Sequence, residues 1–122
     1  MIAYTTVGTN DMARATAFYD ALVAEIGGKR LMDFGRFVAW GVDPAQPMFS
    51  VCTPYDGKPA TAGNGTMVAL GVKNPKQVDA LYKKALELGG TDEGPAGQRG
   101  DQFYIGYFRD LDGNKLNFFC MK

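Results

Sequence analysis

The chain alternates between short segments with a strand pattern and two longer segments with a helical pattern. Residues 2–9 are rich in β-branched and aromatic types, which predicts a strand. Asn10 and Asp11 can cap a helix, and apolar residues then recur at spacings of three and four, as on one helix face: Ala15, Phe18, Leu22 and Ile26. Gly27–Gly28 should end this helix, and we expect strands at 29–33, 36–42 and 48–53.

The same order returns in the second half of the chain. Residues 67–72 predict a strand, Asn74 a helix cap, and Gln77 the capping-box partner of Asn74. The apolar face of this helix comprises Val78, Leu81, Ala85 and Leu88. We expect a glycine-rich polar loop at 91–102, then strands at 103–109 and 114–120 around a hairpin turn whose Asp112-Gly113 favours positive φ.

These elements indicate an internal repeat. With Tyr4 placed over Met67, one constant offset aligns Gly8 with Gly71 and Tyr19 with Tyr82. We therefore predict an α+β fold of two βαβββ repeats in a single domain, 1–122, with repeat 1 at about 1–55, a linker at 56–65 and repeat 2 at about 66–122.

Composition narrows the classes of partner and of chemistry. The chain balances 13 basic against 13 acidic residues, so we expect no nucleic-acid partner. No run approaches the ~18 apolar residues of a membrane span, and we expect a cytoplasmic protein without a membrane partner. Cys52 and Cys120 lie in apolar strand patterns and are expected to be buried thiols. Since histidine is absent, Ser/His/Asp and Cys/His catalysis are excluded.

Strand alternation sorts the side chains into two faces. Val68 and Leu70 should pack on a helix, as should Leu116 and Phe118. The opposite face then offers an apolar surface with a few neutral hydrogen-bonding groups, typical of a small-molecule pocket: Tyr4, Thr6, Met67, Asn117 and Phe119. Trp40 and Tyr104 could add aromatic walls. Arg99 could reach a ligand if the glycine-rich loop acts as a lid, and the alternative for Arg99 is a solvated loop. The alternative is that these residues simply fill a core.

The chain resembles the vicinal oxygen chelate superfamily, which includes glyoxalase I, bleomycin resistance proteins and extradiol dioxygenases. The resemblance is carried by YTTVGTNDMARATAFYDAL, GTMVALGVKNPKQVDALYKKALELGG and YFRDLDGNKLNFF. It implies paired units that form a concave, partly closed mixed sheet with helices outside. It also places the family's metal-ligand positions at Tyr4, Met67 and Asn117, with a fourth near Phe49 or Ser50.

None of these positions holds a usual metal ligand, because Tyr, Met and Asn are poor ligands for zinc, nickel or iron(II). We therefore expect no metal or other cofactor, and a protein that binds a small apolar or aromatic molecule, as the resemblance to bleomycin resistance proteins implies. A glyoxalase-type lyase or isomerase with a non-standard site is one alternative, and a sheet that serves mainly for dimerisation is another. We expect a homodimer, although two repeats could also close within a monomer.

Overall fold

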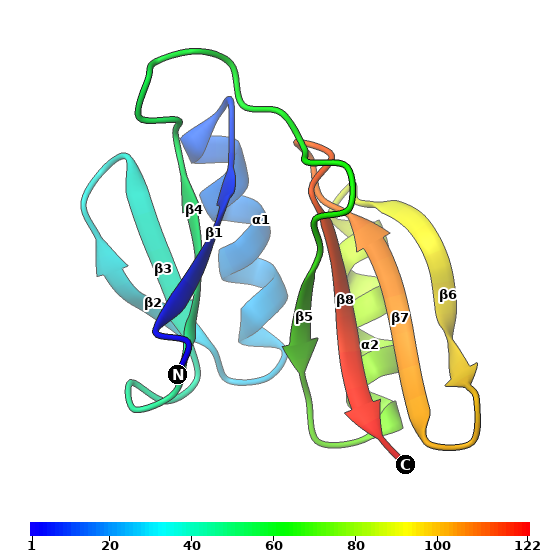
Figure 1. Ribbon diagram of the computed structural model, residues 1–122. Coiled ribbons are helices and arrows are strands. Elements are labelled where there is room, and N and C mark those ends of the chain that lie inside the picture. The colour runs from blue at the N-terminus through cyan, green and yellow to red at the C-terminus, as the bar shows by residue number, and fades with distance from the viewer. The chain divides into compact units, whose positions relative to one another are not determined.

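The computed structural model describes all 122 residues, and each half of the chain holds one helix and four strands (Figure 1). The first half contains β1 (Tyr4–Gly8), α1 (Met12–Ala24), β2 (Lys29–Asp33), β3 (Phe37–Gly41) and β4 (Met48–Cys52). The second contains β5 (Val68–Gly71), α2 (Pro75–Glu87), β6 (Thr91–Arg99), β7 (Phe103–Arg109) and β8 (Lys115–Met121). The predicted α+β fold with two βαβββ repeats is confirmed.

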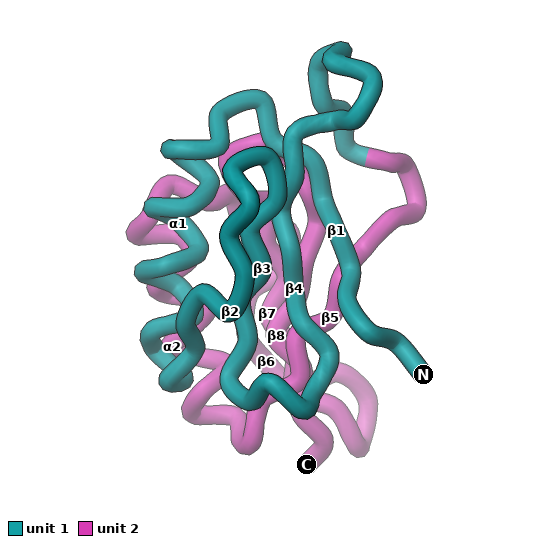
Figure 2. Tube along the Cα trace, turned by 90° about the vertical axis from the view of Figure 1, so that its left-hand side faces the viewer, with its two compact units in different colours: residues 1–62 teal, residues 63–122 magenta.

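The chain divides into two compact units, unit 1 (Met1–Ala62) and unit 2 (Gly63–Lys122), shown in different colours in Figure 2. The strand order is β1-β4-β3-β2 in one sheet and β5-β8-β7-β6 in the other. In each sheet the first pair is parallel and the others are antiparallel. Neither sheet closes on itself, so each keeps one face for its helix and one face away from it, which we call the open face.

The helices begin and end as the sequence predicts. The Asp11 carboxylate accepts a hydrogen bond from Arg14 N at 3.0 Å, and Asn74 Oδ1 accepts one from Gln77 N at 2.9 Å. The Gln77 side chain bonds the backbone N–H of Lys73, one residue before the cap, at 2.8 Å. At the other ends, Gly27 and Gly89 adopt φ values of 75° and 102°, which glycine tolerates best. Neither helix is long and apolar enough to cross a membrane.

The prediction of a loop at 91–102 was wrong, because residues 91–99 form the edge strand β6. Its sequence, TDEGPAGQR, has little strand propensity. The strand pairs with β7 through two register shifts, one between Asp92 and Gly94 and one between Gly94 and Gly97. Bulges and glycines are typical of edge strands, where one row of backbone groups needs no partner. Pairing with β7 therefore overrides local propensity.

Each helix packs on its sheet through the apolar face that the sequence predicts. In unit 1 the core between α1 and the sheet includes Phe18, Leu22, Val38, Trp40 and Val51. In unit 2 it includes Val78, Leu81, Phe108, Leu116 and Phe118, and the rings of Phe108 and Phe118 stack with centroids 5.0 Å apart. These buried contacts fix each sheet against its helix, so that the open face lies on the opposite side of the sheet.

The two cysteines lie on different faces of their sheets. Cys120 is buried on the helix side, as predicted. Cys52 is only half-buried, since β4 alternation places it on the open face with Ser50. Both are free thiols.

Candidate ligand-binding site

The open face of unit 2 brings together three of the predicted site residues. Asn117 lies in the middle strand β8, in register with Ala69 of β5 and Tyr107 of β7. Phe119 follows two residues later on the same face. Met67, just before β5, reaches the same position, because its sulfur accepts a hydrogen bond from Asn117 Nδ2 at 3.7 Å.

Asn117 is the most unusual residue of this face. Its side chain is 2% exposed, yet Oδ1 has no hydrogen-bond partner. Its Nδ2 bonds only a thioether sulfur, which is a weak acceptor. A buried polar atom without a partner costs about 1–3 kcal/mol, and native proteins keep few of them. The amide is therefore poised for a donor that the chain itself does not supply.

The open face of unit 1 repeats this feature at the equivalent position. Ser50 lies in β4 in register with Thr6 of β1 and Ala39 of β3. It is fully buried, and its Oγ has no hydrogen-bond partner. Tyr4 lies on the same face, and its ring meets Phe37 edge-on at a centroid distance of 5.5 Å. Each unit thus holds one unpaired polar atom on the strand next to its first strand.

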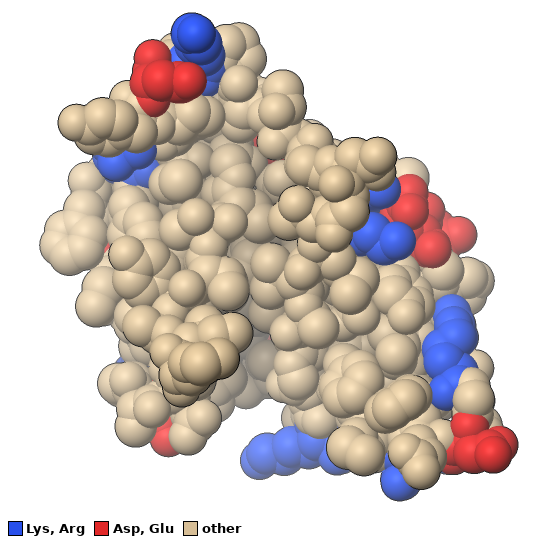
Figure 3. Space-filling view, in the orientation of Figure 1, with Lys and Arg blue, Asp and Glu red and all other residues tan.

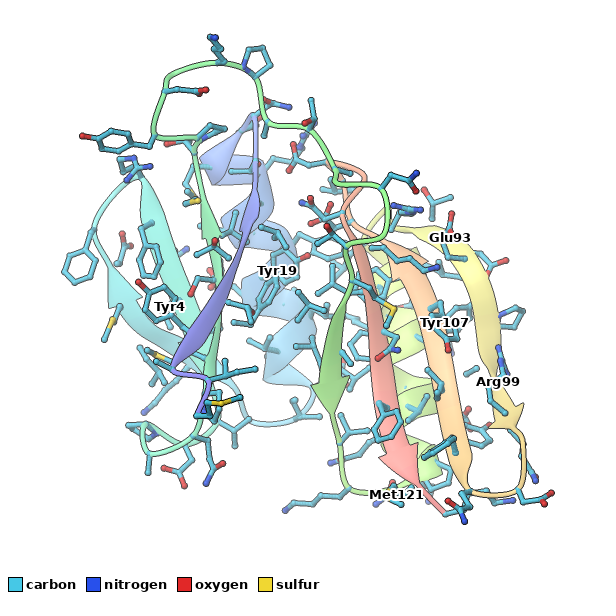
Figure 4. All side chains as sticks on the ribbon, viewed as in Figure 1. Tyr4, Tyr19, Glu93, Arg99, Tyr107 and Met121 are labelled. Carbon is cyan, nitrogen blue, oxygen red and sulfur yellow. The ribbon has the colours of Figure 1, made fainter.

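Several charged side chains lie at the border of the open face of unit 2, around the ring of Tyr107. The Arg99 guanidinium carbon lies 5.7 Å and Lys115 Nζ 5.5 Å from its centroid. Glu93 pairs with Arg109 at 3.2 Å and more distantly with Lys115 at 4.0 Å. Figure 4 shows Glu93, Tyr107 and Arg99 along β6 and β7. In Figure 3 the charged side chains of unit 2 lie at the margins of this face, around a largely uncharged centre.

Glycines in β6 make room for Arg99. A Cβ on Gly97 would lie 3.2 Å from Arg99 Nη1, and one on Gly94 would lie 3.0 Å from Tyr107 Cδ2. Gly94 also has a φ of 156°, which L side chains rarely adopt. Arg99 therefore folds back along its own strand, where Nη2 donates to the carbonyl of Pro95 at 2.6 Å. Arg99 belongs to the open face as a fixed strand residue, and the predicted lid is wrong.

Trp40 does not belong to the open face. It is buried on the helix side of unit 1, where its indole N–H donates to Asp20 Oδ1 of α1 at 2.8 Å. Arg30 of β2 holds the same carboxylate with two hydrogen bonds, of 2.9 and 2.7 Å. The hydrogen bonds from Arg30, and then from Trp40, lower the pKa of Asp20. Trp40 thus joins α1 to its sheet, which corrects its prediction as a cavity wall.

Tyr104 is corrected in the same way in unit 2. Its hydroxyl donates to Asp79 Oδ1 of α2 at 2.6 Å, so the side chain points toward the helix. This hydrogen bond to a carboxylate raises the pKa of the Tyr104 phenol. The aromatic residues of β7 on the open face are Phe103 and Tyr107. Strict alternation along 103–109, anchored on buried Phe108, would have separated Tyr104 from Tyr107.

The residues at the family's ligand positions do not suit the metals of that family. Ser50, and not Phe49, shares the open face of unit 1 with Tyr4. The oxygen and sulfur donors are thus a phenol and a hydroxyl in unit 1, and a thioether and an amide in unit 2. Zinc, nickel and iron(II) sites are built from imidazole, carboxylate and thiolate ligands. No group of three or more His, Cys, Asp or Glu side chains is placed to hold a metal ion.

The two βαβββ units with open sheet faces define the class of glyoxalase-like proteins. Residues 1–118 match the model of the Glyoxalase/Bleomycin resistance protein/Dioxygenase superfamily, and the chain belongs to that superfamily.

Solved structures agree with this assignment. A glyoxalase/bleomycin resistance protein from Albidiferax ferrireducens T118 is 35% identical, with a TM-score of 0.87 over 98% of this chain and 97% of that one. Hypothetical protein SA1046 from S. aureus is 25% identical, with a TM-score of 0.75 over 98% and 91% of the two chains. TioX from Micromonospora sp. ML1, 21% identical, shares the fold with a TM-score of 0.65 over 98% and 95%. No curated protein matches the chain.

Proposed function

We propose that this protein binds a small, partly aromatic or apolar molecule on the open face of unit 2, without the help of a metal. The observation that carries the proposal is Asn117, whose buried Oδ1 lacks a donor among apolar and aromatic neighbours. A ligand N–H or O–H that reaches this oxygen would satisfy it, and the ligand body would cover Phe119 and Tyr107. Ligand pockets generally combine such apolar walls with a few fixed polar groups.

Met67 supplies the access that this function needs. Met67 is 42% exposed, and its sulfur accepts the hydrogen bond from Asn117 Nδ2. Methionine is unbranched and flexible, so it can move aside and repack against a bound molecule. Asn117 is then uncovered only when a ligand replaces Met67.

The donor set supports binding without a metal. The family's ligand positions hold a phenol, a thioether and an amide, at Tyr4, Met67 and Asn117. These groups can accept or donate hydrogen bonds and pack against a ligand, but they bind the divalent metals of this family weakly. The chemistry available at the open face of unit 2 is therefore recognition of a ligand.

A thermal-stability screen tests the proposal. The purified protein is heated with each member of a panel of small aromatic and aliphatic molecules that carry a hydrogen-bond donor. A ligand that binds only the folded protein raises the melting temperature in proportion to RT ln(1 + [L]/Kd), so the rise should grow with concentration. A panel of diverse chemistry in which no molecule shifts the melting temperature would contradict the proposal.

A further inference from the structure

We propose that the ligand is an amphipathic anion, whose negatively charged group binds beside Tyr107 in the positive field of Arg99 and Lys115 while its apolar body lies over Ile105 and Phe119. The inference rests on the proposed function and narrows it to a class of molecule: small aromatic or aliphatic carboxylates and their relatives.

The charges of the open face favour an anion. The face carries three cations, of which Arg109 and Lys115 share the carboxylate of Glu93 and Arg99 is the third. Glu93 lies closest to Arg109 and 4.0 Å from Lys115, while Arg99 has no carboxylate partner. Both Arg99 and Lys115 lie within 6 Å of the Tyr107 centroid, so two positive charges flank that ring.

Arg99 is held in position before any ligand arrives. Its Nη2 and Nη1 donate to the carbonyls of Pro95 and Gln98, at 2.6 and 3.4 Å. These bonds use two of the five N–H donors of a guanidinium and leave the others for an oxyanion. Gly94 and Gly97 provide the space in which the guanidinium lies. A fixed guanidinium loses little freedom on binding, and its fork matches a carboxylate.

The other end of the same face is apolar. Ile105 is in register with Phe119, and Phe103 packs on Phe119 with ring centroids 5.4 Å apart. Met121, at the end of β8, is exposed (Figure 4). This surface is suited to a hydrocarbon or aromatic group, because covering it removes apolar area from water. The polarity of the face thus changes along β8 from Lys115 through Asn117 to Phe119.

The spacing along β8 sets the size of the molecule. Lys115 and Phe119 are four residues apart, about 13 Å at the usual rise of a strand. Asn117 lies halfway between them, where its unpaired Oδ1 can accept from a donor in the middle of the ligand. A molecule with an anionic head, a central donor and an apolar tail fits this order of side chains.

Calorimetric titration with a matched series of probes tests the inference. The probes are phenylalkanoates of increasing chain length and their primary amides, which keep the shape but lose the charge. We expect each carboxylate to bind at least about tenfold more tightly than its amide, with an optimum chain length that places ring and carboxylate at the two ends of the face. Arg99→Gln and Lys115→Gln should each reduce this preference several-fold, and Arg99→Lys should give an intermediate value.

Lys83→Gln is the matched control, because Lys83 is an exposed lysine of α2 on the other side of the sheet. It should leave the preference for carboxylate unchanged, and circular dichroism would establish that all variants fold. Equal affinity for carboxylates and amides would overturn this inference and leave the proposed function standing. No binding by either series would also overturn this inference, whereas the proposed function, which requires a donor for Asn117, is decided by the thermal-stability screen. A preference that survives in both Arg99→Gln and Lys115→Gln would also overturn the placement of the anion.

Discussion

At the scale of single residues, the unpaired amide of Asn117 and the unpaired hydroxyl of Ser50 are the clearest marks of a site. Each occupies a buried position on an open sheet face, where an apolar residue of similar size would be more stable. Proteins often keep such locally unfavourable groups where function needs them. At these two positions the residue that would be best for stability differs from the residue that ligand binding requires.

Replacing Asn117 with leucine should make this separation measurable. Asn117→Leu removes the unsatisfied amide and keeps the volume similar, so the melting temperature should stay the same or rise. Affinity for a ligand found in the screen should fall by about tenfold, the loss of one hydrogen bond. Asn64→Leu, in an exposed turn, makes the same change away from the site and should leave affinity unchanged. A marked loss of stability in Asn117→Leu would contradict this account.

Asp20 gives a second prediction at this scale, one that concerns stability alone. Its pKa lies below the usual value of 3.8, chiefly through hydrogen bonds from Arg30. Above the usual value of 3.8, the ionised Asp20 carboxylate makes its full contribution to the free energy of unfolding. This contribution is lost as the pH falls through the lower pKa that Asp20 has in the folded protein.

Asp20→Asn should accordingly lower the melting temperature near pH 7, and the difference from the parent protein should shrink below about pH 4. Thermal unfolding followed from neutral to acid pH measures this, and ligand affinity at neutral pH should not change. A difference in melting temperature that stays constant into strong acid would argue against the assigned role of Asp20.

At the scale of elements, β6 is the strand whose geometry matters most for the site. It carries Arg99 and Glu93, its register shifts against β7 on both sides of Gly94, and the Arg99 guanidinium lies beside Tyr107 over Gly94 and Gly97. At Gly94 of β6, both the backbone conformation and the room for a side chain are restricted. Its φ of 156° and its closeness to Tyr107 exclude a larger residue without rearrangement.

Gly94→Ala should therefore destabilise the protein by about 1–3 kcal/mol and weaken anion binding, since Tyr107 and Arg99 would both shift. Chemical denaturation measures the first effect and calorimetry with a phenylalkanoate the second. Gly71→Ala is the control for the stability measurement alone, because a Cβ there meets nothing within 4 Å and the backbone is unrestricted, while its register with Phe119 places it on the open face itself. It should be neutral or slightly stabilising. Equal stability of the two variants would contradict the role of Gly94.

The strength of the local signal decided which elements could be predicted from the sequence. Both helices have a clear apolar period, a capping side chain and a glycine end, so their positions follow from local rules. β6 could not be predicted, since its residues become a strand only through pairing with β7. Tyr104 was misplaced although strict alternation with Phe108 would have assigned it to the helix side, where Asp79 accepts its hydrogen bond. Trp40 was misplaced because its hydrogen-bond partner, Asp20, lies on a helix distant in sequence. The unpaired state of Asn117 and Ser50 depends on all their neighbours and leaves no local signal.

At the scale of the whole molecule, the chain keeps the fold of its superfamily. Residues 1–118 match the superfamily, while Tyr4, Met67 and Asn117 stand where the sequence resemblance places metal ligands. A fold of this kind does not fix an activity, because function depends on the side chains that its sheets present. We propose that the open face of unit 2, with Met67 and Asn117 at its centre, binds a ligand directly.

The most direct test of this claim is a calorimetric titration of one ligand from the screen into protein stripped of metals by a chelator, repeated after the addition of zinc, nickel or iron(II). We predict the same affinity and a stoichiometry of one ligand per chain in every case, because hydrogen bonding and apolar packing supply the recognition. Binding that disappears in the stripped protein and returns with one of the metals would contradict the claim.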